Sequence, residues 1–162
     1  MIRHAKPDDR LAISALVEAA FGQPDEARLV EELRANGDVI FELVAKTEDG
    51  AIEGHVLYSR LWADSVMLYA ALAPLSVAPE VQKTGIGSRL MKASLDTARE
   101  FGIHAIILLG HPNYYRRFGF TAEAASRVKS PFSGSPAFMA LALESDALDE
   151  PLTIAYADAF KT

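Results

Sequence analysis

The segment Val81–Leu90, VQKTGIGSRL, restricts most strongly what this chain can fold into, because it joins two segments of different periodicity. Before it, Ala70–Val77 is almost entirely apolar, as expected for a strand that is buried on both faces. After it, apolar residues recur at helical spacing from Ile86 to Phe101, and Gly102 closes the helix. The next segment, HAIILLG, predicts a short buried strand. Strand, helix and strand in this order predict a parallel, right-handed crossover.

The other segments extend this unit to one α/β domain covering residues 1–162. Residues 1–7 predict a first strand, and Asp8 or Asp9 caps a helix that runs to Phe21. Residues 23–38 predict a second helix, and residues 39–47 and 51–61 predict a hairpin with Asp-Gly at its tip. Further expected elements are strands at 64–79, 118–125 and 137–143 and a short helix at 111–117.

Composition excludes several classes of function. The net charge of −6 and the pI near 5.2 argue against nucleic-acid binding over the whole surface. The chain has no cysteine, which excludes disulfides, thiolate metal sites and cysteine nucleophiles. Its first residues lack the apolar run of a signal peptide, and no apolar run approaches a membrane span. We therefore expect a cytoplasmic protein with no membrane partner.

The segment Gln82–Ser88, which we call the glycine loop, has the composition of an anion site. The start of a helix presents unpaired amides and the positive end of its dipole, and two residues without Cβ let those amides close on phosphate oxygens. Lys83 adds charge and Thr84 and Ser88 add hydroxyls. Two other phosphate motifs fail here: the dinucleotide fingerprint needs a small residue where Leu90 stands, and the nucleotide P-loop needs a glycine where Glu80 stands. From spacing alone, a loop whose glycines only make a turn fits equally well.

Two motifs together give the chain a resemblance to the GNAT superfamily of acetyl-CoA-dependent N-acetyltransferases. Gln82-x-x-Gly85-x-Gly87, between a strand and a long helix, resembles its motif A. Tyr115-Arg116-Arg117-Phe118-Gly119-Phe120 resembles its Y-x-x-x-G-F segment, and the resemblance runs from Met1 to about Leu143. It implies a mixed, mostly antiparallel twisted sheet with helices on both faces, in which a central parallel strand pair splays to admit coenzyme A.

The resemblance also implies roles for individual residues. Main-chain groups of the strand end would contact the pantetheine arm, backbone amides of the loop would hold the pyrophosphate, and Tyr115 would protonate the departing thiolate. The family often has an asparagine where this chain has Leu108, and Asn113 is a candidate substitute. The expected coenzyme contacts are Leu75, Ser76, Val77, Gln82, Lys83, Thr84, Gly85, Ile86, Gly87, Ser88 and Asn113. No metal is expected.

Without a cysteine, direct attack of a neutral amine on the thioester is the simplest chemistry. A phenol remains protonated at neutral pH and is a reasonable acid for the thiolate. Tyr114 competes with Tyr115 for this role. The base stays open among His111, Glu42, Glu53, His55 and water.

The leading hypothesis is therefore an N-acetyltransferase that moves an acetyl group from acetyl-CoA to a primary amine. The alternative is a non-catalytic sensor that binds acyl-CoA. The acceptor is a small amine, an amino acid, an aminoglycoside-like compound or a protein amine, and the acidic balance mildly favours a cationic one. Residues 20–37 and 126–137 usually set that choice in such proteins, but here they give no readable code. A homodimer is expected only because relatives are often dimers.

Overall fold

The computed structural model describes residues 1–162 as a mixed sheet flanked by helices. Its strand order is β1-β2-β3-β4-β5-β7, with β8 beside β3 and β6 beside β8. The pairs β1–β2, β2–β3, β3–β8 and β5–β7 are antiparallel, whereas β4–β5 and the short pair β6–β8 are parallel. The strands are β1 Ile2–His4, β2 Val39–Lys46, β3 Ile52–Ala63, β4 Tyr69–Val77, β5 Ala105–Leu109, β6 Val128–Lys129, β7 Phe138–Ala142 and β8 Leu152–Tyr156.

The α-helices precede and follow these strands in the order that the sequence predicts. They are α1 Arg10–Phe21, α2 Asp25–Ala35, α3 Ile86–Glu100 and the single turn α4 Pro112–Tyr115. Four 3-10 turns add η1 Pro7–Asp9, η2 Pro79–Val81, η3 Arg116–Phe118 and η4 Asp158–Phe160. No helix is long and apolar enough to cross a membrane.

The chain divides into two compact units. The first contains Met1–Ser59 and Ala73–Asp96, and the second contains Arg60–Leu72 and Thr97–Thr162. The chain passes from one unit to the other within β3, β4 and α3.

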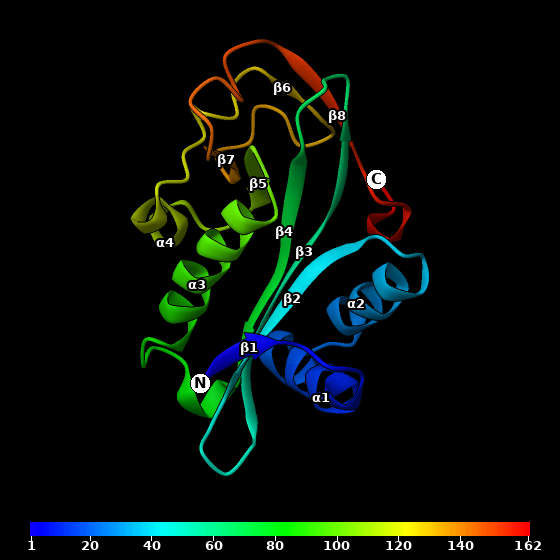
Figure 1. Ribbon diagram of the computed structural model, residues 1–162, viewed down its shortest axis with the longest axis vertical. Helices are drawn as coiled ribbons and strands as arrows, with labels where there is room; N and C mark the ends of the chain where they lie inside the picture. The colour runs from blue at the N-terminus through cyan, green and yellow to red at the C-terminus, as the bar shows by residue number, and fades with distance from the viewer. The chain divides into compact units, whose positions relative to one another are not determined.

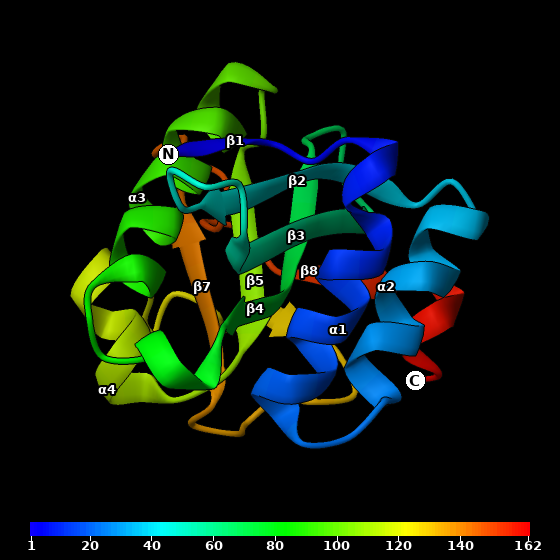
Figure 2. The same ribbon diagram turned by 90° about the horizontal axis from the view of Figure 1, so that it is seen from below.

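In the first unit, the two faces of the β2–β3 hairpin are covered by different helices. Val44 of β2 packs with Ile13 and Val17 of α1 and Ala27 of α2. Figures 1 and 2 show α1 and α2 running side by side next to β2. On the opposite face Gly54 of β3 lies against α3, since a Cβ there would stand 2.6 Å from Leu90 Cδ1. The alternation of side chains along a strand thus places helices on both faces.

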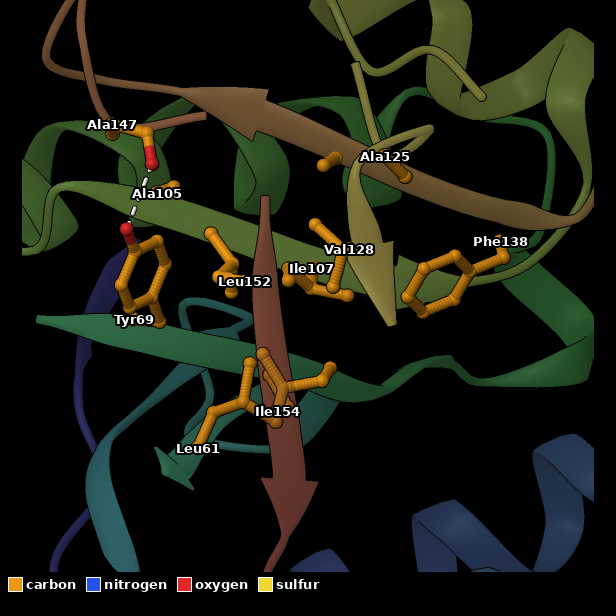
Figure 3. Close-up of a cluster of buried hydrophobic side chains, with 12 residues drawn as sticks. Leu61, Tyr69, Ala105, Ile107, Ala125, Val128, Phe138, Ala147, Leu152 and Ile154 are labelled. Carbon is orange, nitrogen blue, oxygen red and sulfur yellow. Dashed lines mark hydrogen bonds between the residues drawn. The ribbon is translucent and has the colours of Figure 1, made fainter. Parts of the chain in front are cut away.

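In the second unit, the core forms around the parallel pair. Tyr69, Ala70 and Ala71 of β4 pair with Ala105, Ile106 and Ile107 of β5. Figure 3 shows Ile107 surrounded by apolar side chains from β3, β6, β7 and β8, and the Tyr69 hydroxyl donating to the Ala147 carbonyl at 2.7 Å.

The structure differs from three sequence-based expectations and adds two strands. The strand expected at 64–79 begins only at Tyr69, because the preceding residues form a turn in which the Ser65 hydroxyl accepts from Met67 N. Residues 118–125 form no strand: Gly119 has φ +96°, successive turns follow, and only Thr121 bridges to Ala140. Asp9 is the N-cap residue of α1, as expected, but its carboxylate makes no cap hydrogen bond and instead accepts from Arg3 and from the Lys6 amide. The strands β6 and β8 were not predicted.

Candidate active site

The glycine loop leads from η2 into α3 and is exposed. Gly85 has φ +94°, a conformation that residues with a Cβ rarely adopt. Lys83 also has a positive φ, 65°. The first helical hydrogen bond runs from Arg89 N to Gly85 O at 3.0 Å, so the amides before Arg89 lie outside the ladder of α3. The loop therefore presents backbone donors at the positive end of a fifteen-residue helix.

Two side chains of this loop hold it in place. The amide nitrogen of Gln82 donates to the Val77 carbonyl at 3.0 Å, which ties the loop to the end of β4. The Thr84 hydroxyl donates to the Val81 carbonyl. The Thr84 hydroxyl is thus hydrogen-bonded to the backbone in this arrangement, and its contact with an anion stays a prediction.

Arg89 is a cation that the sequence interpretation missed. Its guanidinium nitrogen lies 3.6 Å from the position that a Gly85 Cβ would occupy, and its side chain is exposed. The spacing could have predicted its position, because Arg89 is four residues after Gly85 and therefore lies one helical turn further on, beside the loop.

The end of β4 contributes Leu75, Ser76 and Val77 to the same unit. Ala78 N donates to Glu53 O at 2.9 Å, which anchors the strand end to β3. Leu75 and Val77 are half-buried, whereas Ser76 is 2% exposed and its hydroxyl has no hydrogen-bond partner. The first unit thus brings the expected pantetheine strand and the expected pyrophosphate loop together through the contact of Val77 with Gln82.

The second unit holds the other two predicted residues, Asn113 and Tyr115, on α4. Asn113 is exposed, and Leu108, at the position where the GNAT resemblance implies an asparagine, is buried at 2% exposure. Tyr115 is half-buried, and its ring meets the edge of Tyr114 with centroids 5.0 Å apart. Burial, with a smaller contribution from Tyr114, raises the pKa of the Tyr115 phenol to about 12. Tyr115 therefore keeps its proton throughout the neutral range.

The charged residues on the hairpin strands form a buried array. Glu42 accepts from Arg34 through both oxygens, at 3.0 and 2.8 Å, and its Oε1 lies 2.7 Å from His55 Nε2. His55 is fully buried. Despite the cost of burial, hydrogen bonds from His55 and Arg34 lower the pKa of Glu42 to about 2, whereas desolvation lowers the pKa of His55. Alternation along the strands alone could not show that Glu42 pairs with Arg34 of α2 and that His55 is buried beside it.

A mixed sheet with a glycine loop between a strand and a long helix is the arrangement expected of the GNAT class, and comparison with known proteins agrees. The profile of the Acetyltransferase (GNAT) family matches residues 10–120. The chain belongs to this family. It is 34% identical over 151 residues to the protein named Uncharacterized N-acetyltransferase YhbS of Escherichia coli strain K12, covering 92% of this chain and 90% of that protein.

Two solved structures are similar over almost the whole chain. The crystal structure of the GNAT family N-acetyltransferase YhbS from Escherichia coli in complex with CoA has a TM-score of 0.92 and 31% identity, covering 100% of this chain and 92% of that one. A GNAT family acetyltransferase from Brucella melitensis in complex with acetyl-CoA has a TM-score of 0.81 and 33% identity, covering 99% and 97%. These neighbours confirm the predicted family and fold class.

Proposed function

We propose that this protein transfers an acetyl group from acetyl-CoA to a primary amine by direct attack, without an acyl-enzyme. The observation that carries the proposal is the exposed glycine loop at the start of α3, in a chain that matches a CoA-bound relative with a TM-score of 0.92. Residues 1–162 would act as one acetyltransferase domain. A cytoplasmic location and a homodimer stay predictions.

The first unit supplies the groups that would hold the coenzyme. Amides of the loop from Gln82 to Ser88 bind the pyrophosphate, and the guanidinium of Arg89 adds positive charge beside Gly85. Main-chain groups of Leu75–Val77 bind the pantetheine arm as an added strand would. Asn113 of the second unit is the proposed side-chain contact from the tip after β5.

Tyr115 is the proposed acid. The neutral amine nitrogen attacks the thioester carbonyl carbon, the C–S bond breaks, and the electron pair leaves on sulfur. The nitrogen gives up one proton to water or to the base, which stays open among His111, Glu42, Glu53 and His55, so that the products are the amide and the thiol. The phenol then stabilises the thiolate by donating a hydrogen bond or its proton. Its raised pKa makes Tyr115 a persistent donor at neutral pH, although a weaker acid than an ordinary tyrosine. General acid help of this kind typically contributes about 10²–10⁴ in rate.

A non-catalytic acyl-CoA sensor is the second candidate function. The glycine loop would serve a sensor equally well, since binding the pyrophosphate needs only its amides and charge. The half-buried phenol of Tyr115 favours the enzyme, because binding alone needs no proton donor.

The test begins with thermal stabilisation of the purified protein by acetyl-CoA, with NAD and ATP as controls. A ligand at about 100 times its Kd should stabilise the fold by about 2.7 kcal/mol. Thiol release from acetyl-CoA is then measured with a panel of primary amines: an amino acid, a polyamine, an aminoglycoside and a lysine peptide.

The variant Tyr115→Phe separates the two functions. We expect kcat to fall by about 10² or more while stabilisation by acetyl-CoA is retained. Tyr114→Phe is the matched control, because it removes the neighbouring phenol and keeps the ring that packs on Tyr115. Unchanged turnover in Tyr115→Phe would reject the assigned acid, and coenzyme binding with no transfer to any amine would favour the sensor.

A further inference from the structure

Gly110, between β5 and α4, lies directly against the ring of Tyr115. A Cβ built on Gly110 would stand 2.5 Å from Cε2, 2.9 Å from Cδ2 and 3.5 Å from Cζ of that ring. The first two distances are shorter than real Cβ contacts, so no other residue fits unless the ring moves. The phenol carbon Cζ is itself within contact distance of this position.

Gly110 is a glycine because of space and not because of backbone conformation. It is absent from the residues with positive φ, so its backbone is one that other residues adopt. The ring of Tyr115 occupies the place of the missing side chain. The space taken by the Tyr115 ring, and not the backbone conformation of a turn, therefore requires glycine at position 110.

The backbones of Gly110 and Tyr115 are both hydrogen-bonded to neighbouring residues. Gly110 N donates to Ala137 O at 2.9 Å, next to the pairing of Leu109 with Phe138. Tyr115 N donates to His111 O at 3.1 Å, and Tyr115 O accepts from Phe120 N at 3.3 Å. These hydrogen bonds oppose a backbone shift at either residue, so the group expected to move away from an added Cβ is the ring of Tyr115.

The ring of Tyr115 also has aromatic neighbours that limit its rotation. Tyr114 meets it edge-on at 5.0 Å and 87°, and the Phe120 ring lies at 6.2 Å and 72°. With the backbone and these rings in place, the orientation of the phenol depends on the bare Cα of Gly110.

We propose that Gly110 is a positioning residue, whose missing side chain sets the orientation of the Tyr115 phenol toward the leaving thiolate. The inference rests on the proposed function of Tyr115 as the acid. Displacing a catalytic group by about 1 Å can cost about 10²-fold in rate. Gly110 is thus needed for the chemical step, and its contact is with the ring of Tyr115 and not with the coenzyme-binding residues Gln82–Ser88.

The test is a double-mutant cycle of Gly110→Ala with Tyr115→Phe. The assay uses saturating acetyl-CoA and an amine of the panel that the wild-type protein acetylates. We expect Gly110→Ala to lower kcat at least tenfold in the wild-type background and less than twofold in Tyr115→Phe, with KM for acetyl-CoA unchanged. NMR of ¹³C-labelled tyrosine should show the Tyr115 ring signals shifted in Gly110→Ala.

Gly102→Ala is the matched control. Gly102 lies in the same unit and has φ +78°, and a Cβ there meets no atom within 4 Å. This substitution strains the backbone without touching Tyr115, so kcat should stay within twofold of the wild type.

The outcomes separate this inference from the proposed function. If Tyr115→Phe lowers kcat but Gly110→Ala does not, or lowers it equally in both backgrounds, the positioning role is wrong and the acid stands. A Gly110→Ala protein that fails to fold, while Gly102→Ala folds, would show a structural role and overturn the proposal. Unchanged kcat in Tyr115→Phe, or no transfer by the wild type, overturns the proposed acid or function and this inference with it.

Discussion

At the scale of single residues, Gly85 shows how backbone conformation serves a binding loop. Its φ of +94° directs the chain into α3, whose ladder begins with the bond from Arg89 N to Gly85 O. The space at its Cα is open apart from Arg89, at 3.6 Å, so conformation and not crowding demands glycine here. The sequence motif located this residue. A glycine required by backbone conformation and a glycine required by lack of space for a Cβ, however, look identical in a sequence.

Gly85→Ala should weaken binding of acetyl-CoA about tenfold. The left-handed conformation costs a residue with a Cβ roughly 1–2 kcal/mol. The free loop of the variant relaxes to escape this strain, so binding must restore the conformation, and 1.4 kcal/mol is about a factor of ten in Kd. Isothermal titration with acetyl-CoA measures the change. Gly22→Ala is the control, since Gly22 ends α1 with φ +71° and has nothing within 4 Å of its Cβ position. Equal Kd values for Gly85→Ala and the wild type would contradict the assignment of the loop.

At the scale of elements, the contact of β3 with α3 depends on Gly54. A Cβ there would lie 2.6 Å from Leu90 Cδ1, 3.0 Å from Ile86 Cγ2 and 3.4 Å from the Cβ of Ala45. The missing side chain lets the helix that follows the glycine loop lie close against the sheet. Close packing of this kind gives α3 a fixed position on the first unit, and its first turn carries the amides of the loop.

Gly54→Ala should destabilise the fold by about 1–3 kcal/mol, the usual cost of overpacking a core. Urea unfolding measures the free energy. Leu90→Val removes the atom that clashes, so the double variant should lose less stability than the sum of the two single changes. Strict additivity would show that the two residues are not coupled as the distances imply.

Sequence patterns predicted the long elements of this fold and failed for some of the short ones. The helix at Ile86 and the hairpin of β2 and β3 were predicted because their periodicity extends over many residues. The segment from Phe118 to Ala125 misled, because its apolar residues suit a strand while Gly119 and the turns after it prevent one. In β8, Leu152 and Ile154 are buried between exposed neighbours, but an alternation over five residues is too short to identify alone.

At the scale of the whole molecule, the charged array and the single tryptophan lie in different units. Arg34, Glu42 and His55 belong to the first unit and Trp62 to the second. Three covalently continuous elements cross from one unit to the other. If residues 1–162 unfold as one domain, loss of stability in the array must appear in the fluorescence of Trp62.

Stability should fall as the pH drops below about 6.5. The pKa of His55 is lowered from 6.5 in the fold, so the unfolded chain takes up a proton first. The pKa of Glu42 is lowered from 4.5 to about 2, so a further loss occurs between those two values. In both cases the unfolded state binds more protons, and both changes destabilise the fold toward acid. Thermal unfolding followed by Trp62 fluorescence from pH 8 to pH 3 measures the effect.

His55→Gln provides the comparison, because glutamine can donate to Glu42 but does not titrate. Its profile should be flatter than that of the wild type between pH 6.5 and 5. The unfolding transition seen in Trp62 fluorescence is compared between the wild type and His55→Gln. If it is identical in both proteins while circular dichroism reports a second transition, the two units unfold separately and the one-domain proposal is wrong.

The sequence alone determined the order of the main elements, the glycine loop and the family, because these depend on local periodicity and on motifs that are contiguous in the chain. Only the tertiary structure decided which side chains hydrogen-bond within the fold, such as Gln82 to the Val77 carbonyl and Thr84 to the Val81 carbonyl. It also decided that Glu42 and His55 are buried and that Gly110 leaves room for Tyr115. Burial and close approach depend on which segments pack together in space, and no local pattern in the chain encodes that.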